Sequence, residues 1–241
     1  MSMNHATATA AGRTGATILM VVAAVTLAGS GAMAAVAAAP HAAAVQSGQN
    51  LEKPPTWKVR YDDRSAGERA YEVMRPGWHV HSGPAGILWD DGRFAAGNYS
   101  VASTIFLFPA GQGEPPSQVE APYGLLLAGE GLEGSGARYV SFMLRNDGSF
   151  RVARHTGNQI QEIVPWTASE AIATWTESTE GTAKNLLAVD ATIESVTFWV
   201  NDEHVASLSR AELPMDGIVG LRAGADVSLH ITDIAIGPNR R

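Results

Sequence analysis

From residue 57 onward, short apolar runs with a period of two residues alternate with segments rich in Gly, Pro, Asn and Asp. Successive side chains of a β-strand point to opposite faces, so this period is typical of strands with one buried face. SVTFWV (195–200) and VSLHI (227–231) are two such runs. Only TASEAIATW (167–175) is suited to a short helix. Many short strands joined by turns therefore predict an all-β fold, an antiparallel two-sheet sandwich or barrel.

The segment YVSFMLRNDGSFRVARH (139–155) predicts a β-hairpin whose register can be chosen from its apolar residues. A three-residue loop at 146–148 pairs Leu144 with Phe150 and Phe142 with Val152, which keeps one face apolar. A two-residue loop would pair apolar with polar residues, because a one-residue slip turns every side chain over. We therefore expect a type I turn with Gly148 in the left-handed region. The opposite face of this hairpin then carries Tyr139, Arg145, Arg151 and His155.

Four consecutive polar residues, 201–204, could form a catalytic or metal cluster or the tip of a second hairpin. A two-residue type I′ turn at Asn201-Asp202 pairs Phe198 with Val205, and also Trp199 with His204. Neighbouring residues 203 and 204 then point to opposite faces and cannot act on one substrate atom. The sequence therefore predicts a turn here, with His204 beside Trp199.

The last strand, 227–231, would send Asp233 into the core if its alternation continued unchanged. We expect a bulge near Asp233 that returns Ile234 and Ile236 to the core.

Residues 1–34 have the organisation of a secretory signal peptide: Arg13, an apolar run at 16–28, and small residues up to Ala34. An uncleaved membrane anchor is the alternative, although the apolar run is short for a span. We expect a flexible leader at 35–55, a jelly-roll domain at 56–238, a secreted or periplasmic location, and no membrane span after cleavage. The sequence contains no Cys, so no disulfide can form.

The formal net charge is −7, and loss of Arg13 with the signal peptide makes it one unit more negative. Proteins that bind nucleic-acid backbones need clustered Lys and Arg. The composition therefore argues against a nucleic-acid partner.

Taken in order, the runs GWHVHSG, YSVASTIFLFP, YGLLLAG, DGSFRV, NLLAVDA, TFWVNDEHVASL, GIVGLRAG and LHITDIAI resemble the concanavalin A-like jelly roll of lectins, laminin-G-like modules and glucanases. The later runs are also similar to secreted bacterial domains of the 3-keto-disaccharide hydrolase type. The resemblance covers about 78–236. It implies two antiparallel sheets, one of them concave, with sugars often bound on the concave face or its rim loops.

A retaining glycosidase needs two carboxylates about 5 Å apart. The glucanases of this fold supply them from one strand as E-x-D-x-x-E, and that motif is absent. The remaining acidic pairs are adjacent or lie in loops: Asp90 with Asp91, Glu130 with Glu133, and Glu177 with Glu180.

Two short clusters carry metal-ligand residue types. His79 and His81 share a strand face, but no Glu follows at the spacing that a cupin metal site uses. Asp90 and Asp91 in a Gly-containing turn could supply oxygen ligands to Ca²⁺. Turn-forming Asp residues are commoner than metal sites, so we expect no cofactor, with Ca²⁺ as the alternative.

Sugar binding needs an aromatic ring for the sugar's C–H face and planar polar groups for its hydroxyls. The sequence therefore predicts a carbohydrate-binding or recognition module without its own catalytic centre. A sugar-directed hydrolase and a structural envelope protein are the alternatives. The candidate ligand-binding residues are the polar face of the first hairpin and two loop-adjacent tryptophans: Tyr139, Arg145, Arg151, His155, Trp89 and Trp166.

Overall fold

The computed structural model describes residues 53–63, 65–109, 120–175 and 182–239. The predicted signal peptide and most of the leader therefore lie outside the described residues, as do Glu177 and Glu180. The described residues contain no helix, so the short helix expected at 167–175 is wrong. The first two residues of that segment, 167 and 168, belong instead to strand β9 (Gln159–Ala168). No helix in these described parts of the chain has the length and apolar character needed to cross a membrane.

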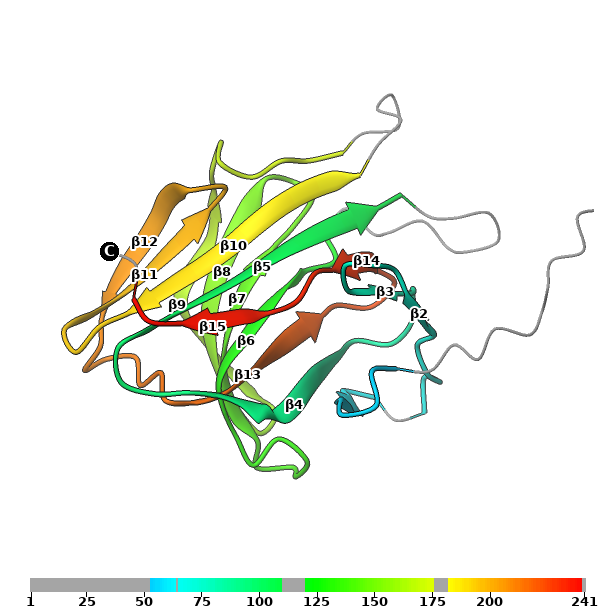
Figure 1. Ribbon diagram of the computed structural model, residues 1–241, viewed down its shortest axis with the longest axis horizontal. Helices are drawn as coiled ribbons and strands as arrows, with labels where there is room; N and C mark the ends of the chain where they lie inside the picture. The colour runs from blue at the N-terminus through cyan, green and yellow to red at the C-terminus, as the bar shows by residue number, and fades with distance from the viewer. Residues whose placement is uncertain (1–52, 64, 110–119, 176–181, 240–241) are drawn as a thin grey trace, which may run out of the picture. The chain divides into compact units, whose positions relative to one another are not determined.

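The strands form two antiparallel sheets, which Figure 1 shows lying face to face. A seven-stranded sheet has the order β1-β4-β13-β6-β7-β8-β9. Besides β9, the members of this sheet are β1 (Lys58–Tyr61), β4 (Gly86–Ala95), β6 (Tyr123–Glu130), β7 (Arg138–Leu144), β8 (Ser149–Thr156) and β13 (Gly217–Ala223). The antiparallel two-sheet sandwich predicted from the alternation is confirmed.

The second sheet has the order β12-β11-β10-β5-β14-β3-β2, and a further short strand, β15, pairs with β5. The bounds are β2 (Tyr71–Val73), β3 (Trp78–Val80), β5 (Tyr99–Phe108), β10 (Ala183–Ala191), β11 (Ser195–Val200), β12 (Glu203–Ser209), β14 (Ser228–Ile231) and β15 (Ala235–Gly237).

The core lies between the two sheets and is built by every second residue of the central strands. Along β5 and β10, buried and partly exposed residues alternate over the whole strand. Phe142 of β7 and Phe198 of β11 meet across the layers edge to face, with ring centroids 5.1 Å apart. Aromatic pairs in this geometry add to the stabilisation that area burial alone provides.

The β7–β8 hairpin has the predicted register. Leu144 lies opposite Phe150 and Phe142 lies opposite Val152. The amide of Gly148 donates to the carbonyl of Arg145 at 3.2 Å, and Gly148 has a φ of +80°. Both features are those of a type I turn followed by a left-handed residue.

The β11–β12 hairpin has the predicted turn but only part of the predicted register. Asn201 and Asp202 have φ values of +51° and +67°, as a type I′ turn requires. Trp199 lies opposite His204 as expected, with ring centroids 5.5 Å apart. The predicted pairing of Phe198 with Val205 is wrong, because a bulge after Phe198 places Ala206 opposite it.

The chain leaves the sheet between β14 and β15, where a bulge was expected. Thr232 bonds to the main chain of Thr104, and Ile234 is fully buried. Ile236 packs against the core from its partly buried position on β15. The interruption therefore has the predicted effect of returning both isoleucines to the apolar side.

Candidate functional site

The candidate site lies on the outer face of the seven-stranded sheet, the face turned away from the core. Strand alternation sends Val140, Phe142 and Leu144 of β7 into the core, so Tyr139 and Ser141 face outward. On β13, Arg222 is the outward residue between Leu221 and Ala223, both of which belong to the core.

A loop of residues 131–137, which joins β6 to β7 and is called the strap here, folds over part of this outer face. Leu132 and Ala137 of the strap form a separate apolar cluster with Ile87, Trp89 and Leu126 of the sheet. Tyr139 belongs to the same cluster. The strap therefore covers the middle of the outer face and leaves openings on either side.

Strand β1 holds the strap at its outer end. The guanidinium of Arg60 donates to the carbonyl of Gly134 at 2.6 Å. Lys58 forms ion pairs with Asp91, at 2.5 Å, and with Glu133. Hydrogen bonds to Asp91 and Glu133 raise the pKa of Lys58, so this ammonium is charged at every pH of interest.

A cavity of about 480 Å³ opens beside the strap, and this size suits a small-molecule ligand. The side chains that bound it come from β1, β13, β7, β8 and β9, so segments from both ends of the sequence build one site. Its lining consists of Arg60, Tyr61, Asp62, Gly134, Ser135, Tyr139, His155, Gly157, Asn158, Ile160 and Arg222.

Asp62 and Arg222 form a two-pronged ion pair at one side of this cavity. Nη1 of Arg222 donates to Oδ1 of Asp62 at 2.8 Å, and Nη2 donates to Oδ2. Burial alone would raise the pKa of Asp62, but the hydrogen bonds and charge of Arg222 outweigh it and lower this pKa. The pair is thus ionised, and its planar groups have a fixed orientation that can recognise hydroxyl groups.

Tyr139 and His155 also line the cavity. Their rings stack with centroids 4.2 Å apart and planes 8° apart, and both side chains are almost completely buried. Nε2 of His155 lies 2.9 Å from the hydroxyl of Ser141. Burial lowers the pKa of His155 to about 3, and the charges of Arg222 and Arg151 add to this effect. His155 is therefore a neutral, rigidly held ring at neutral pH.

Three more of the predicted residues meet on the same outer face. The guanidinium carbon of Arg145 lies 3.7 Å from the ring centroid of Trp166, and that of Arg151 lies 4.8 Å from it. Arg151 also pairs with Glu162 at 3.2 Å. Trp166 reaches these arginines because the pairing of β8 with β9 shifts register opposite Arg151.

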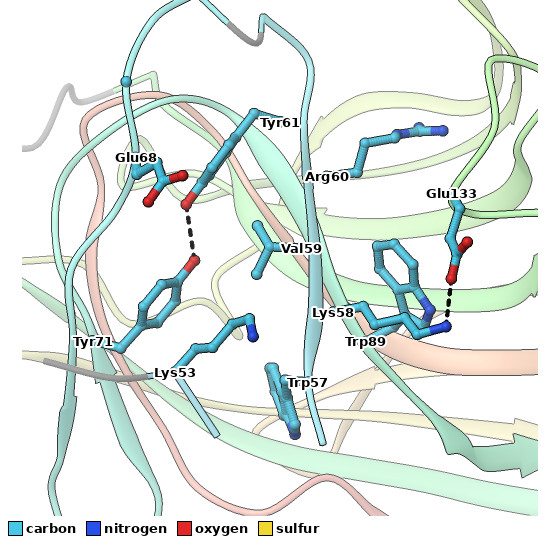
Figure 2. A pocket seen from close by; sticks show the side chains of 11 residues that line it. Lys53, Trp57, Lys58, Val59, Arg60, Tyr61, Glu68, Tyr71, Trp89 and Glu133 are labelled. Carbon is cyan, nitrogen blue, oxygen red and sulfur yellow. Dashed lines mark hydrogen bonds and ion pairs between the residues drawn. The ribbon is translucent and has the colours of Figure 1, made fainter. Parts of the chain in front are cut away.

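Trp89 is the candidate that the structure places apart from the others. Only 2% of it is exposed, because the strap packs on it, and its Nε1 donates to Asp91 at 2.9 Å. It borders a second cavity of about 680 Å³ at the β1 edge. Figure 2 shows β1 passing between two groups of lining side chains, Tyr61 and Tyr71 on one side, Lys58 and Glu133 on the other.

The predicted metal candidates have other partners. Asp90 accepts hydrogen bonds from Thr56 and from the amide of Gly92, while Asp91 turns to Trp89 and Lys58. These two carboxylates therefore diverge, within β4 rather than in a separate turn. The rings of His79 and His81 lie together, with centroids 4.5 Å apart. Within the ranges that the structure describes, no three His, Asp or Glu side chains are grouped to hold a metal.

Sequence reasoning missed Asp62, Arg222 and Arg60 as members of the site. Arg222 carried a usable signal, because it is a charged residue at an outward position of an otherwise apolar strand. Its partner Asp62 lies 160 residues earlier, and no local pattern connects the two.

The two-sheet architecture has the fold of a concanavalin A-like jelly-roll β-sandwich. The carbohydrate-binding module CBM66 from Bacillus subtilis has a similar structure, with a TM-score of 0.54 and 10% identity over 76% of this chain and 95% of that one. A GH16 protein of the Bacteroides ovatus mixed linkage glucan locus, in complex with a G4G4G3G product, has a TM-score of 0.50 and 9% identity over 78% and 97%. The VIP36 exoplasmic/lumenal domain, in a Ca²⁺- and mannose-bound form, has a TM-score of 0.50 and 10% identity over 78% and 85%.

These likenesses concern the fold alone, because the identities are low. No protein-family model and no curated protein matches the chain.

Proposed function

We propose that the protein is an exported carbohydrate-recognition module that binds a saccharide in the cavity between Asp62, Arg222 and His155. The export is inferred from the signal-peptide organisation of residues 1–34. The 3-keto-disaccharide hydrolase-type kinship inferred from the later strands remains part of this proposal and rests on the sequence motifs alone.

One observation carries the proposal: fixed planar polar groups converge on a cavity of ligand size on the outer face of the sheet. The carboxylate of Asp62 accepts hydrogen bonds, and the guanidiniums of Arg60 and Arg222 donate them. Exposed Ser135 and Asn158 add hydroxyl and amide groups at the rim. Such a set matches the alternating donors and acceptors of sugar hydroxyls.

The mode of binding differs from the open aromatic platform that the sequence predicts. Tyr139 is only 4% exposed and its ring stacks on His155, so it lines the cavity without presenting an open ring face. We infer that hydrogen bonds to planar groups, more than stacking, orient the sugar. The similar structures with carbohydrate binding, glucan product or mannose in their names support a saccharide as the ligand class.

The number of carboxylates that line the cavity favours recognition over hydrolysis. Among the described residues that line the cavity, Asp62 is the one carboxylate, and Arg222 holds it ionised. A glycosidase of the usual kind needs a second carboxyl group to act as acid or nucleophile.

The test is a glycan array probed with the mature protein, followed by the Asp62→Ala variant. We expect binding to a defined set of saccharides and its loss in Asp62→Ala. Asp63→Ala is the matched control, because Asp63 is the next residue and its carboxylate accepts hydrogen bonds from Ser65 within its own turn. No binding to any saccharide, or equal loss in both variants, contradicts the proposal.

A further inference from the structure

Three arginines of the outer face lie in one continuous row that crosses six strands. The register pairs Arg60 of β1 with Ile87, Ile87 with Arg222 of β13, and Arg222 with Gly124. The row continues from Gly124 to Met143 and from Met143 to Arg151 of β8. Neighbouring strands of a sheet are about 4.8 Å apart, so the five steps between these six strands span about 24 Å.

Between Arg222 and Arg151 the row passes through Gly124 and Met143. Gly124 has no side chain, and Met143 is buried. Neither residue therefore places an exposed side chain between Arg222 and Arg151. An extended ligand that lies across the strands can contact both.

Positive charge exceeds negative charge along the row, although the chain as a whole is acidic. Arg222 is paired with Asp62, and Arg151 is paired with Glu162. Arg60 donates to a main-chain carbonyl rather than to a carboxylate. Arg145, two residues from Met143 on the same face, contacts the ring of Trp166. The row and its immediate partners therefore include four guanidinium groups and two carboxylates.

The guanidiniums at the Trp166 end have unused hydrogen-bonding capacity. The Nε atoms of Arg145 and Arg151 are buried, and neither has a hydrogen-bond partner among the described residues. Buried donors of charged groups are usually satisfied. A ligand acceptor would satisfy either Nε atom after its side chain moves to expose it.

The charges of the row also act on the neighbouring ring of His155. After burial, the charges of Arg222 and Arg151 are the next causes that lower the pKa of His155, ahead of the opposing effect of Asp62. Both arginines therefore lie close enough to His155 for their charges to act on its ring.

From the row, its charge and its unsatisfied donors, we infer that the ligand is an acidic saccharide, whose uronate carboxylate is bound by Arg145 and Arg151 beside Trp166. This inference rests on the proposed function and narrows its ligand class. A guanidinium offers two parallel N–H donors, which match the two oxygens of a carboxylate. A neutral hydroxyl group supplies only one acceptor atom and no charge. The remaining sugar units then lie toward Arg222 and the cavity that Arg222 and Arg60 line.

Calorimetry with two matched probes tests the inference: a hexameric oligogalacturonate and the same hexamer with its carboxyl groups methyl-esterified. The two probes share a backbone and differ in charge. We expect the acid to bind at least about tenfold more tightly than the ester, and this ratio to shrink as salt is raised.

The Arg145→Gln/Arg151→Gln variant should bind the acid about as weakly as the ester. Lys184→Gln is the control for a general loss of positive charge, since Lys184 is exposed on β10 of the other sheet, and it should bind the acid like the wild type. Unchanged melting temperatures show that both variants are folded.

Equal affinity for acid and ester, or wild-type affinity in the double variant, overturns the inference. Binding of neutral glycans alone also overturns it while leaving the proposed function intact. If no saccharide of either kind binds, both fail.

Discussion

Arg69 is expected to be one of the largest single contributors to the stability of the fold. Arg69 as a whole is only 4% exposed, and the five N–H groups of its guanidinium donate to five main-chain carbonyls. Three of these carbonyls belong to the β3–β4 connection, at residues 81–84, and two to the β13–β14 connection, at 224–227. The main chain of Arg69 also donates to the hydroxyl of Tyr61 at 2.9 Å, which ties β1 to the same centre. Burial lowers the pKa of Arg69 to about 10, so the group is charged at neutral pH.

The magnitude follows from the number of carbonyls that lose a donor. In Arg69→Met, five carbonyls lose charge-assisted hydrogen bonds, each with a net value of about 1 kcal/mol or more. Removing a buried charge also removes its desolvation penalty, which offsets part of that sum. We expect a net loss of about 3–5 kcal/mol in the free energy of unfolding. For a domain of this size that corresponds to about 6–20 °C in melting temperature.

Urea denaturation followed by tryptophan fluorescence measures this loss. Arg69→Lys keeps the charge but has three donors, so at least two carbonyls stay unpaired and the variant should lie between wild type and Arg69→Met. Arg138→Met is the control, because Arg138 is an exposed arginine in a surface ion pair and should cause no measurable change. A stability of Arg69→Met within about 1 kcal/mol of the wild type would refute the reasoning.

The other predictions concern a buried amide and a buried histidine. Asn185 is fully buried and bonds to Tyr123, Ala173 and Asn201, so Asn185→Ala should lose about 2–4 kcal/mol in urea denaturation, whereas exposed Asn98→Ala should lose nothing measurable. His155 has a folded-state pKa of about 3, below an unfolded value near 6.5, so it stabilises the fold above pH 6.5 and this contribution is lost as pH falls toward 3. The melting temperature of the wild type should therefore fall more steeply between pH 6.5 and 4 than that of His155→Gln, and parallel curves would rule out a neutral buried ring.

Local rules predicted the hairpins, because the residues that decide each register are neighbours in the sequence. Phe142, Leu144, Phe150 and Phe198 are all buried as the alternation requires. Val205 was placed one residue out of register, because it is the extra residue of a bulge between the Phe198–Ala206 and Trp199–His204 pairs. No turn residue in this part of the sequence indicates the bulge.

The sequence could predict the residues of the site only where they lie on a single hairpin. Tyr139, His155, Arg145 and Arg151 share a face because they lie on β7 and β8, or just beyond, and the period of two places them together. Asp62 and Arg222 come from distant strands, and their proximity depends on the strand order of the whole sheet. The strap could not be predicted from the sequence either. A Gly-rich loop has no hydrophobic periodicity, so nothing local indicated that Leu132 would bury Trp89.

A structure of the protein bound to a saccharide selected on the glycan array tests the central claim most directly, because it locates the ligand. The account predicts density against Asp62 and Arg222, extending across the strands toward Arg151, with the strap at its side. A saccharide bound instead on the eight-stranded sheet, or in the cavity between Tyr61 and Tyr71, would contradict it.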